Sequence, residues 1–231
     1  MRQYDFLKDY FENDIDDIIY RKLNKDRQVN YHFRSDNVGK CSKLFDAYMK
    51  SKYKISKKNW QKFYFEKQDK KPLAEASKFI ADKHKIDILE AKKYVLFRVV
   101  GQTWNGMVRE MNIVKELEQE FNNILFLKSD YEKDEQYFTD WEAFDNRTKL
   151  LFGIQIKPIS YQKMNTPYQL KAKENHNKQK LEYMQKYNTQ HIMVYYDGDK
   201  IHDKERLLDE IDTMLFMQLL TKKKKDANTK T

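Results

Sequence analysis

The chain has 231 residues and a formal net charge of +9; 40% of its residues are hydrophobic and 14% are aromatic. This length predicts one elaborated domain or two small ones, and the positive charge favours a polyanionic partner through counterion release. The single cysteine, Cys41, excludes a disulfide framework and a cysteine-based zinc site, and the lack of a long apolar run or a signal peptide predicts a cytoplasmic protein without a membrane partner.

The first hundred residues are predicted to form a mostly helical region. Apolar residues recur at helical spacing over 6–19, but the pattern weakens over 28–41, where we expect a loop or a short extended segment. A helix over 72–85 is expected to begin at its proline. Asp87 is expected to cap the next helix, over 88–100.

From residue 104 onward, helical and strand patterns alternate, which predicts a mixed α/β (α+β) fold. The expected order is helix, three-strand meander, helix, strand and a final helix. The corresponding segments are a helix over 104–121, strands over 124–127, 136–142 and 149–157 with Asp145 and Asn146 in a turn, a helix over 168–187, a strand over 191–196, and a helix from Asp203 to Leu220. A basic tail over 221–231 is expected to be disordered.

Two of these strands carry polar residues that packing does not explain. Asp140 lies in an aromatic and apolar run, where an unpaired charge is costly unless a cation binds it. Gln155 and Lys157 share one face of the next strand, because alternate strand residues point the same way. Oxygen ligands beside a lysine favour Mg²⁺ and a phosphate group. Non-functional explanations also exist. Asp140 could be a surface aspartate on an edge strand, and Gln155 and Lys157 could form the polar face of a half-buried strand.

A further acid would help to hold Mg²⁺, since the Gln155 amide is neutral. Glu110 lies on the apolar stripe of the 104–121 helix, where an unpartnered acid is unusual. Glu142 is two residues after Asp140 and shares its strand face. We prefer Glu110 and leave Glu142 open.

Basic residues of the helical region are candidates for contacts with phosphates or bases. The candidates are Arg34, Lys57, Lys58, Lys62 and Arg98. Trp60, Phe63 and Phe65 lie among them in sequence and are expected in the core rather than stacked on bases.

The element order, with Asp140 on the second strand and Gln155-Ile156-Lys157 on the third, resembles the core of the PD-(D/E)XK nucleases over about residues 104–196. Two positions depart from that pattern: Thr139 replaces the usual proline and Gln155 replaces the usual acid, which leaves the number of metal ions open. The stretch Gln102–Glu110 is similar to the MjaI-type restriction endonucleases.

This resemblance implies a type II restriction endonuclease that makes Mg²⁺-dependent double-strand cuts at a short palindrome, CTAG, and leaves 5′-phosphates. It implies Asp140, Gln155, Lys157 and Glu110 as catalytic residues, with Asp140, Gln155 and Glu110 holding the metal. Residues 1–100 would recognise DNA, and residues 101–220 would form the catalytic core. A homodimer and a cognate DNA methyltransferase are the expected partners.

Two other functions remain open from the sequence. One is a PD-(D/E)XK nuclease of repair or of mobile elements, which cuts by DNA structure. The other is a noncatalytic, basic DNA-binding protein in which Asp140 and Lys157 merely pair with each other.

Overall fold

In the computed structural model, the described residues are 17–145 and 149–228. The chain divides into two units, Met1–Val108 and Arg109–Thr231. Most of the helix expected over 6–19, and Asn146 of the expected turn, lie outside the described residues. None of the described helices is long and apolar enough to cross a membrane.

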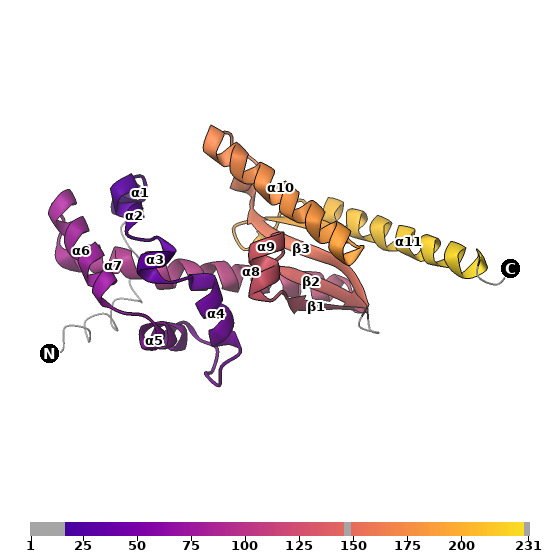
Figure 1. Ribbon diagram of the computed structural model, residues 1–231, viewed down its shortest axis with the longest axis horizontal. Coiled ribbons are helices and arrows are strands. Elements are labelled where there is room, and N and C mark those ends of the chain that lie inside the picture. Colours follow the sequence, from indigo (N-terminus) through magenta and orange to yellow (C-terminus); the bar gives the residue numbers. More distant parts are fainter. Residues whose placement is uncertain (1–16, 146–148, 229–231) are drawn as a thin grey trace. The chain divides into compact units, whose positions relative to one another are not determined.

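The described part of the first unit is helical, as the sequence predicts (Figure 1). Its helices are α1 (Asp17–Asn24), α2 (Arg27–Tyr31), α3 (Ser35–Val38), α4 (Cys41–Met49), α5 (Lys57–Lys67), α6 (Lys71–His84), α7 (Ile88–Leu96), the π-helical turn η3 (Phe97–Gly101) and the start of α8 (Gln102–Glu120). The expected caps are present, because a proline follows the first residue of α6 and the Asp87 carboxylate accepts the Leu89 N–H.

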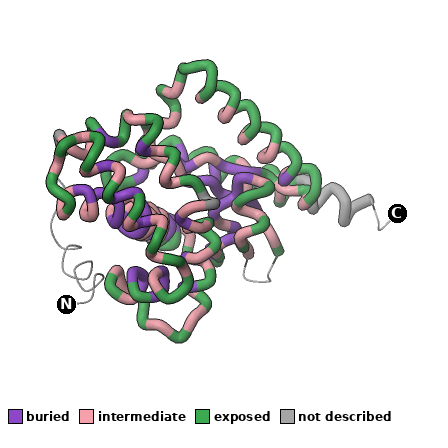
Figure 2. The backbone as a smooth tube through the Cα atoms, turned by 60° about the vertical axis from the view of Figure 1, so that its left-hand side comes forward, coloured by how far each residue is buried: buried purple, intermediate pink, exposed green. Residues whose placement is uncertain are grey.

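An aromatic cluster forms the centre of the first unit. Phe45, Tyr48 and Trp60 pack together with ring centroids 4.9–5.6 Å apart. The Trp60 indole N–H donates to the Val100 carbonyl at 3.0 Å, so this buried polar atom is satisfied. Phe63 is also buried and Phe65 is partly buried, which confirms that the aromatic residues beside the lysines belong to the core. Along the helices, buried and exposed stretches of the backbone alternate (Figure 2).

The segment 28–41 contains short helices, so the expectation of a loop or extended segment was wrong. The Asp26 carboxylate caps α2 by accepting the N–H groups of Gln28 and Val29. Val29 and Val38 are buried in the core of this unit. Tertiary packing therefore stabilises turns that are too short to show a clear apolar period.

The second unit contains a sheet whose described strands have the order β1-β2-β3-β4-β5. The strands are β1 (Ile124–Lys128), β2 (Trp141–Asp145), β3 (Leu150–Pro158), β4 (Gln190–Asp197) and β5 (Lys200–Ile201). β1, β2 and β3 form the predicted antiparallel meander, and β4 is parallel to β3. A parallel neighbour requires a crossover, which α10 (Pro167–Tyr187) provides.

The two faces of β3 have different neighbours. Phe152, Ile154 and Ile156 belong to an apolar cluster that includes residues of α8 and α11 (Lys204–Asn228). On the other face, α10 lies along the sheet and brings Tyr183 against Gly153, where a Cβ atom would lie 2.6 Å from the tyrosine ring (Figure 1). Gln155 and Lys157 follow Gly153 on this second face, as the alternation of the strand predicts.

One predicted strand was misplaced. The expectation of a strand over 136–142 was wrong, since residues 131–137 form α9 (Tyr131–Tyr137) and β2 starts at Trp141. The Asp130 carboxylate accepts the Lys133 N–H and caps α9, whereas Phe138 ends the helix in a left-handed conformation. The aromatic residues that follow α9 resemble a strand in sequence but form the turn into β2.

The final helix extends further than the sequence suggested. α11 continues to Asn228, into the segment over 221–231 for which disorder was expected. Leu207 and Ile211 are buried in the core of the second unit. Phe216, Met217 and Leu219 are each more than half exposed. The first half of α11 thus packs on its own core, and the next turns present apolar side chains to solvent.

Candidate active site

Asp140 is held at the entrance to β2 by both its backbone and its side chain. Its N–H donates to the Ile154 carbonyl at 2.8 Å. Its carboxylate Oδ2 accepts the Ile156 N–H at 2.8 Å and the Gln155 amide Nε2–H at 2.5 Å. Asp140 retains only 6% exposure. The side chain predicted on one strand and the amide predicted on the next therefore meet directly.

Gln155 has one satisfied and one unsatisfied polar atom. The side chain is fully buried and its Nε2 donates to Asp140. Its carbonyl oxygen Oε1 has no hydrogen-bond partner in the structure. A buried amide oxygen without a donor is costly unless something else binds it. Beside a carboxylate, that atom is suited to a hard cation, which prefers oxygen ligands.

Lys157 is half-buried on the same face as Gln155. Its ammonium lies 4.7 Å from the centroid of the Phe138 ring. The His176 ring stacks on Phe138 at 3.8 Å, and the Tyr161 hydroxyl contacts His176 Nδ1 at 2.9 Å. Among the described residues no ion pair joins Lys157 to Asp140. The aromatic side chains thus support a lysine whose charge remains available to a ligand.

Glu110 extends from α8 toward the same group of charges. Its Oε2 lies 3.0 Å from the Lys128 ammonium at the end of β1. Burial and the Asp140 charge raise the pKa of Glu110 to about 7, against the opposing effect of Lys128 and Lys157. The charges of Asp140 and Lys157 therefore both act on Glu110, and Gln155 is in direct contact with Asp140.

The family is decided by comparison of the whole sequence with family models. The model described as MjaI restriction endonuclease matches residues 21–212. The chain belongs to the MjaI restriction endonuclease family. Comparisons with curated proteins and with solved structures return no match. The match spans both units, and it confirms the resemblance seen in the sequence and the expected DNA endonuclease class.

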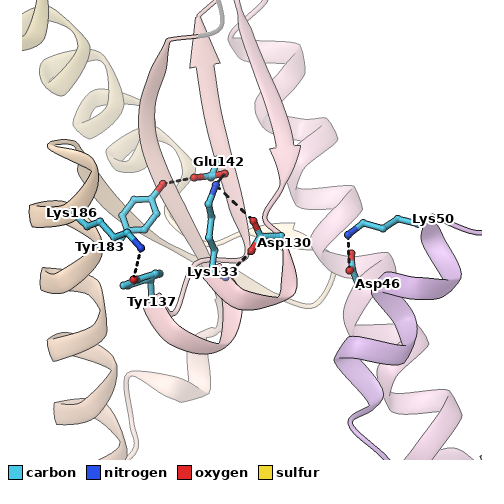
Figure 3. A network of polar contacts seen from close by, with 8 residues as sticks. All are labelled: Asp46, Lys50, Asp130, Lys133, Tyr137, Glu142, Tyr183 and Lys186. Atoms are coloured by element: carbon cyan, nitrogen blue, oxygen red, sulfur yellow. Dashed lines mark hydrogen bonds and ion pairs between the residues drawn. The ribbon is translucent and has the colours of Figure 1, made fainter.

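Glu142 is the other acid that was considered for the site. Both of its carboxylate oxygens have partners within the fold. Its Oε2 lies 2.7 Å from the Lys133 ammonium, and its Oε1 accepts the Tyr183 hydroxyl at 2.8 Å (Figure 3). Lys133 also lies 4.0 Å from Asp130, the N-cap residue of its helix. Glu142 is buried in this network, which ties β2 to α9 and α10.

Asp134 was not identified from the sequence, yet it interacts electrostatically with the site. It lies half-buried on α9. Burial and the Asp140 charge raise the pKa of Asp134 to about 6. The helix that carries Asp134 could have been predicted from the capping residue Asp130 and the acidic residues that follow it. It was not predicted because a strand was expected over 136–142.

The five basic residues proposed for DNA contacts differ in their exposure and in their contacts with other side chains. Lys58 and Lys62 are exposed and lie one helical turn apart on α5, and Lys57 is half-buried beside them. Arg34 is exposed, 4.5 Å from the Tyr31 ring centroid. Arg98 donates to Asn24 and Asn30 at 2.7 and 3.2 Å, so its guanidinium links η3 to α1 and α2.

A groove of about 610 Å³ lies beside α9 and α10. Its lining includes the polar side chains of Gln136, Asn175, His176 and Lys178. Through His176 the groove adjoins the ring that supports Lys157. Asp140 is not part of the groove lining.

No set of three or more histidine, cysteine or acidic side chains within the described residues is arranged to hold a metal. Mg²⁺ does not require such a set, because it binds through one or two carboxylates and keeps waters and substrate phosphates as further ligands. The Asp140 carboxylate and the unpartnered Gln155 Oε1 meet this lesser requirement.

Proposed function

We propose that the protein is a type II restriction endonuclease that requires Mg²⁺ and cuts both strands of a short palindromic DNA site, CTAG. The family assignment supports the restriction endonuclease class, and the CTAG site follows from the MjaI-type resemblance. The observation that carries the chemistry is the contact between Asp140 and Gln155, with a free amide oxygen at its centre and Lys157 two residues further along β3.

Asp140 and Gln155 would hold the metal, with Glu110 as the further acid. Mg²⁺ in such a site would activate water and neutralise charge on the phosphate. The Ile156 N–H and the Gln155 amide fix one oxygen of Asp140, which leaves the carboxylate oriented before any ligand binds. Glu110 keeps a contact with Lys128 and is thereby held near the site.

Lys157 would act on the substrate itself. Its ammonium would hydrogen-bond to the scissile phosphate and orient the attacking water, where negative charge develops. The water oxygen forms the new bond to phosphorus, the bond from phosphorus to the 3′ oxygen breaks, and that oxygen leaves as a hydroxyl. The products would carry a 5′-phosphate and a 3′-hydroxyl.

A homodimer is proposed because a palindromic site has two equivalent halves, which a two-fold symmetric pair of subunits matches. The exposed apolar residues of α11, Phe216 and Leu219, are suited to such a contact. The gene of a DNA methyltransferase that protects the same site would be the expected neighbour of this one.

The noncatalytic reading loses its main support, because it required Asp140 and Lys157 to pair. Asp140 instead contacts Gln155 and Ile156, and Lys157 contacts Phe138. A nuclease that cuts by DNA structure remains the second candidate, since it would use the same site. Discrete plasmid fragments favour sequence-specific cleavage, whereas cleavage confined to branched DNA favours the second candidate.

The decisive experiment is cleavage of plasmid DNA in Mg²⁺ by the parent and by Lys157→Ala. We expect the parent to give discrete fragments that end at CTAG. We expect the variant to cut at least about 100-fold more slowly, because one positively charged hydrogen-bond donor to the transition state is lost. Lys163→Ala removes an exposed lysine just after β3 and serves as the matched control. Equal cleavage by Lys157→Ala and the parent would refute the site.

A further inference from the structure

His176 lies beside the candidate site, yet the proposed chemistry has no use for it. It is half-buried near the middle of α10. Its ring stacks on the Phe138 ring, with the centroids 3.8 Å apart and the planes 11° from parallel. The Lys157 ammonium lies 4.7 Å from the centroid of the same phenyl ring. One aromatic side chain therefore contacts both the histidine of α10 and the lysine of β3.

The backbone of Phe138 is held in an uncommon conformation. Its φ of 54° is left-handed, which a bulky residue adopts only where the surroundings hold it. Its N–H donates to the Asp134 carbonyl at 3.2 Å, and its own carbonyl is contacted by His191 Nε2 at 2.9 Å. Because the backbone is fixed, the direction of the ring depends on the side chains that pack against it.

Tyr161 in turn holds His176. Its hydroxyl contacts His176 Nδ1 at 2.9 Å, and the two rings are 24° from parallel. Tyr161 belongs to the short helix η4 (Ile159–Tyr161), directly after β3, and the Lys173 ammonium lies 5.6 Å from the centroid of its ring. The imidazole is thus fixed by a hydrogen bond as well as by the stack on Phe138.

The Lys157 side chain requires such support. Fixing a long lysine side chain in one direction costs conformational entropy. Within residues 17–145 and 149–228, no carboxylate forms an ion pair with its ammonium. A cation beside an aromatic face is attracted to the ring without being neutralised. The Phe138 ring therefore orients the ammonium and leaves its charge available to a phosphate.

The charge of His176 agrees with a packing role. Burial and the positive charge of Lys157 lower the pKa of His176 below its usual value. The ring is therefore neutral at neutral pH. A neutral imidazole stacks on Phe138 without repelling the ammonium that contacts the same ring.

We propose that His176 is a positioning residue for DNA cleavage: its stack on Phe138 fixes the ring that orients Lys157 toward the scissile phosphate. This inference rests on the proposed function, which gives Lys157 its role. His176 itself neither contacts the DNA nor transfers a proton. It acts on the rate of cleavage and not on the affinity for DNA.

The test measures cleavage and binding separately with the full-length protein and a short duplex that carries one site cut by the parent. Cleavage is followed in Mg²⁺ with the enzyme in excess, and the Kd for the duplex is measured in Ca²⁺. His176→Ala should lower the cleavage rate constant about tenfold or more, because the reacting groups are misplaced, and should leave the Kd within about twofold of the parent.

Two further variants give the rescue and the control. His176→Phe keeps an aromatic ring on Phe138 and should restore the rate constant to within about threefold of the parent. Asn177→Ala changes the exposed neighbour of His176 on α10 and should match the parent in both rate constant and Kd.

A double-mutant cycle shows whether His176 acts through Lys157. In the Lys157→Ala background, His176→Ala should slow the remaining cleavage by less than about twofold, because the side chain that it positions is already absent. An undiminished tenfold effect in that background would mean that His176 acts by another route, and would overturn the inference.

The remaining outcomes separate this inference from the proposed function. If Lys157→Ala is slow but His176→Ala cuts like the parent, His176 has no positioning role and the proposed function survives. If His176→Phe is as slow as His176→Ala and both bind DNA more weakly, His176 contacts a phosphate directly and the inference is wrong. If the parent does not cut, or Lys157→Ala cuts as fast as the parent, both proposals fail.

Thermal unfolding of each variant shows that the protein assayed is folded. If His176→Ala is unfolded at the assay temperature, Tyr161→Phe replaces it in the test, because it removes only the hydroxyl that contacts the imidazole. Tyr161→Phe should lower the rate constant about threefold, with the Kd of the parent, through the loss of one hydrogen bond. An unchanged rate constant in that variant would then overturn the inference.

Discussion

At the residue scale, the candidate site depends on a few side chains whose partners differ in kind. Asp140 accepts two hydrogen bonds on one oxygen, and the amide that donates one of them keeps a free carbonyl. Glu142 lies two residues away and has both oxygens occupied by Lys133 and Tyr183. Similar acids on one short segment therefore take different roles, which are set by the donors around each carboxylate.

Glu142 provides a prediction that separates structure from chemistry. Glu142→Gln should lower the free energy of unfolding by about 1–3 kcal/mol, because the buried contact to Lys133 loses its charge. The folded Glu142→Gln variant should still cut DNA. Glu110→Gln, in contrast, should fold normally but cut DNA poorly. Denaturant unfolding and plasmid cleavage measure the two effects. Loss of cleavage in a stable Glu142→Gln variant would exchange the assigned roles of the two acids.

His191 predicts a pH dependence of stability. It is buried, its Nε2 contacts the Phe138 carbonyl at 2.9 Å, and burial lowers its pKa to about 4. An unfolded histidine has a pKa of about 6.5 and so binds its proton first as the pH falls. The folded state therefore loses stability between about pH 6.5 and pH 4, by at most about 3 kcal/mol from this group, and no further loss from it follows below that range.

The measurement compares urea unfolding of the parent and of His191→Gln at several pH values. The glutamine amide can still donate to the Phe138 carbonyl but does not titrate, so the variant should lose less stability over this range. The difference between the two curves isolates the histidine from the carboxylates, which titrate in both proteins. Parallel curves would contradict the assignment.

At the element scale, β3 and its crossover helix set the position of the site. Gly153 allows Tyr183 of α10 to approach the strand, and Tyr183 in turn reaches Glu142 on β2. Phe138 ends α9 in a left-handed turn, and its ring supports Lys157. The alternation along β3 then directs Gln155 and Lys157 to the face on which these contacts occur.

Two glycines, one on β3 and one on α8, should respond in opposite ways to an added methyl group. Gly153→Ala places a Cβ atom 2.6 Å from the Tyr183 ring and should destabilise the protein by about 1–3 kcal/mol. Gly106 lies within α8 and a Cβ there meets nothing within 4 Å, so Gly106→Ala should stabilise by roughly 0.5–1 kcal/mol through helix propensity. Thermal unfolding of both variants tests the pair; equal effects would contradict it.

At the scale of the whole molecule, the net charge of +9 and the family match both point to DNA. The first unit has a dense aromatic core, and its exposed lysines lie on the surface of α5. The second unit holds the acids, the amide and the lysine of the candidate site. We propose that the first unit contributes to DNA recognition and that the second cuts.

This division predicts the salt dependence of DNA binding. Lys58→Ala with Lys62→Ala should reduce the slope of log K against log salt concentration by about 2, because each lysine that contacts a phosphate releases about one counterion. Binding is measured in Ca²⁺ over a series of salt concentrations. The double variant Lys78→Ala with Lys115→Ala removes two other exposed lysines and is the control. An unchanged slope in the first variant would place the DNA elsewhere.

The sequence by itself determined the helical first region, the order of the three-strand meander, the crossover helix and the shared face of Gln155 and Lys157, although it misplaced β2. These features follow from local periodicity, which one chain segment carries alone. It also indicated the family, since the order of the elements and the types of residue at the site were sufficient.

Only the tertiary structure decided which polar side chains meet. The contact of Gln155 with Asp140 and the hydrogen bond from Tyr183 to Glu142 join residues from different elements. α9 was also missed, because seven residues are too few to show a helical period and their stability comes from the cap and from packing. Distances between elements depend on how the whole unit packs, and no local pattern in the sequence encodes them.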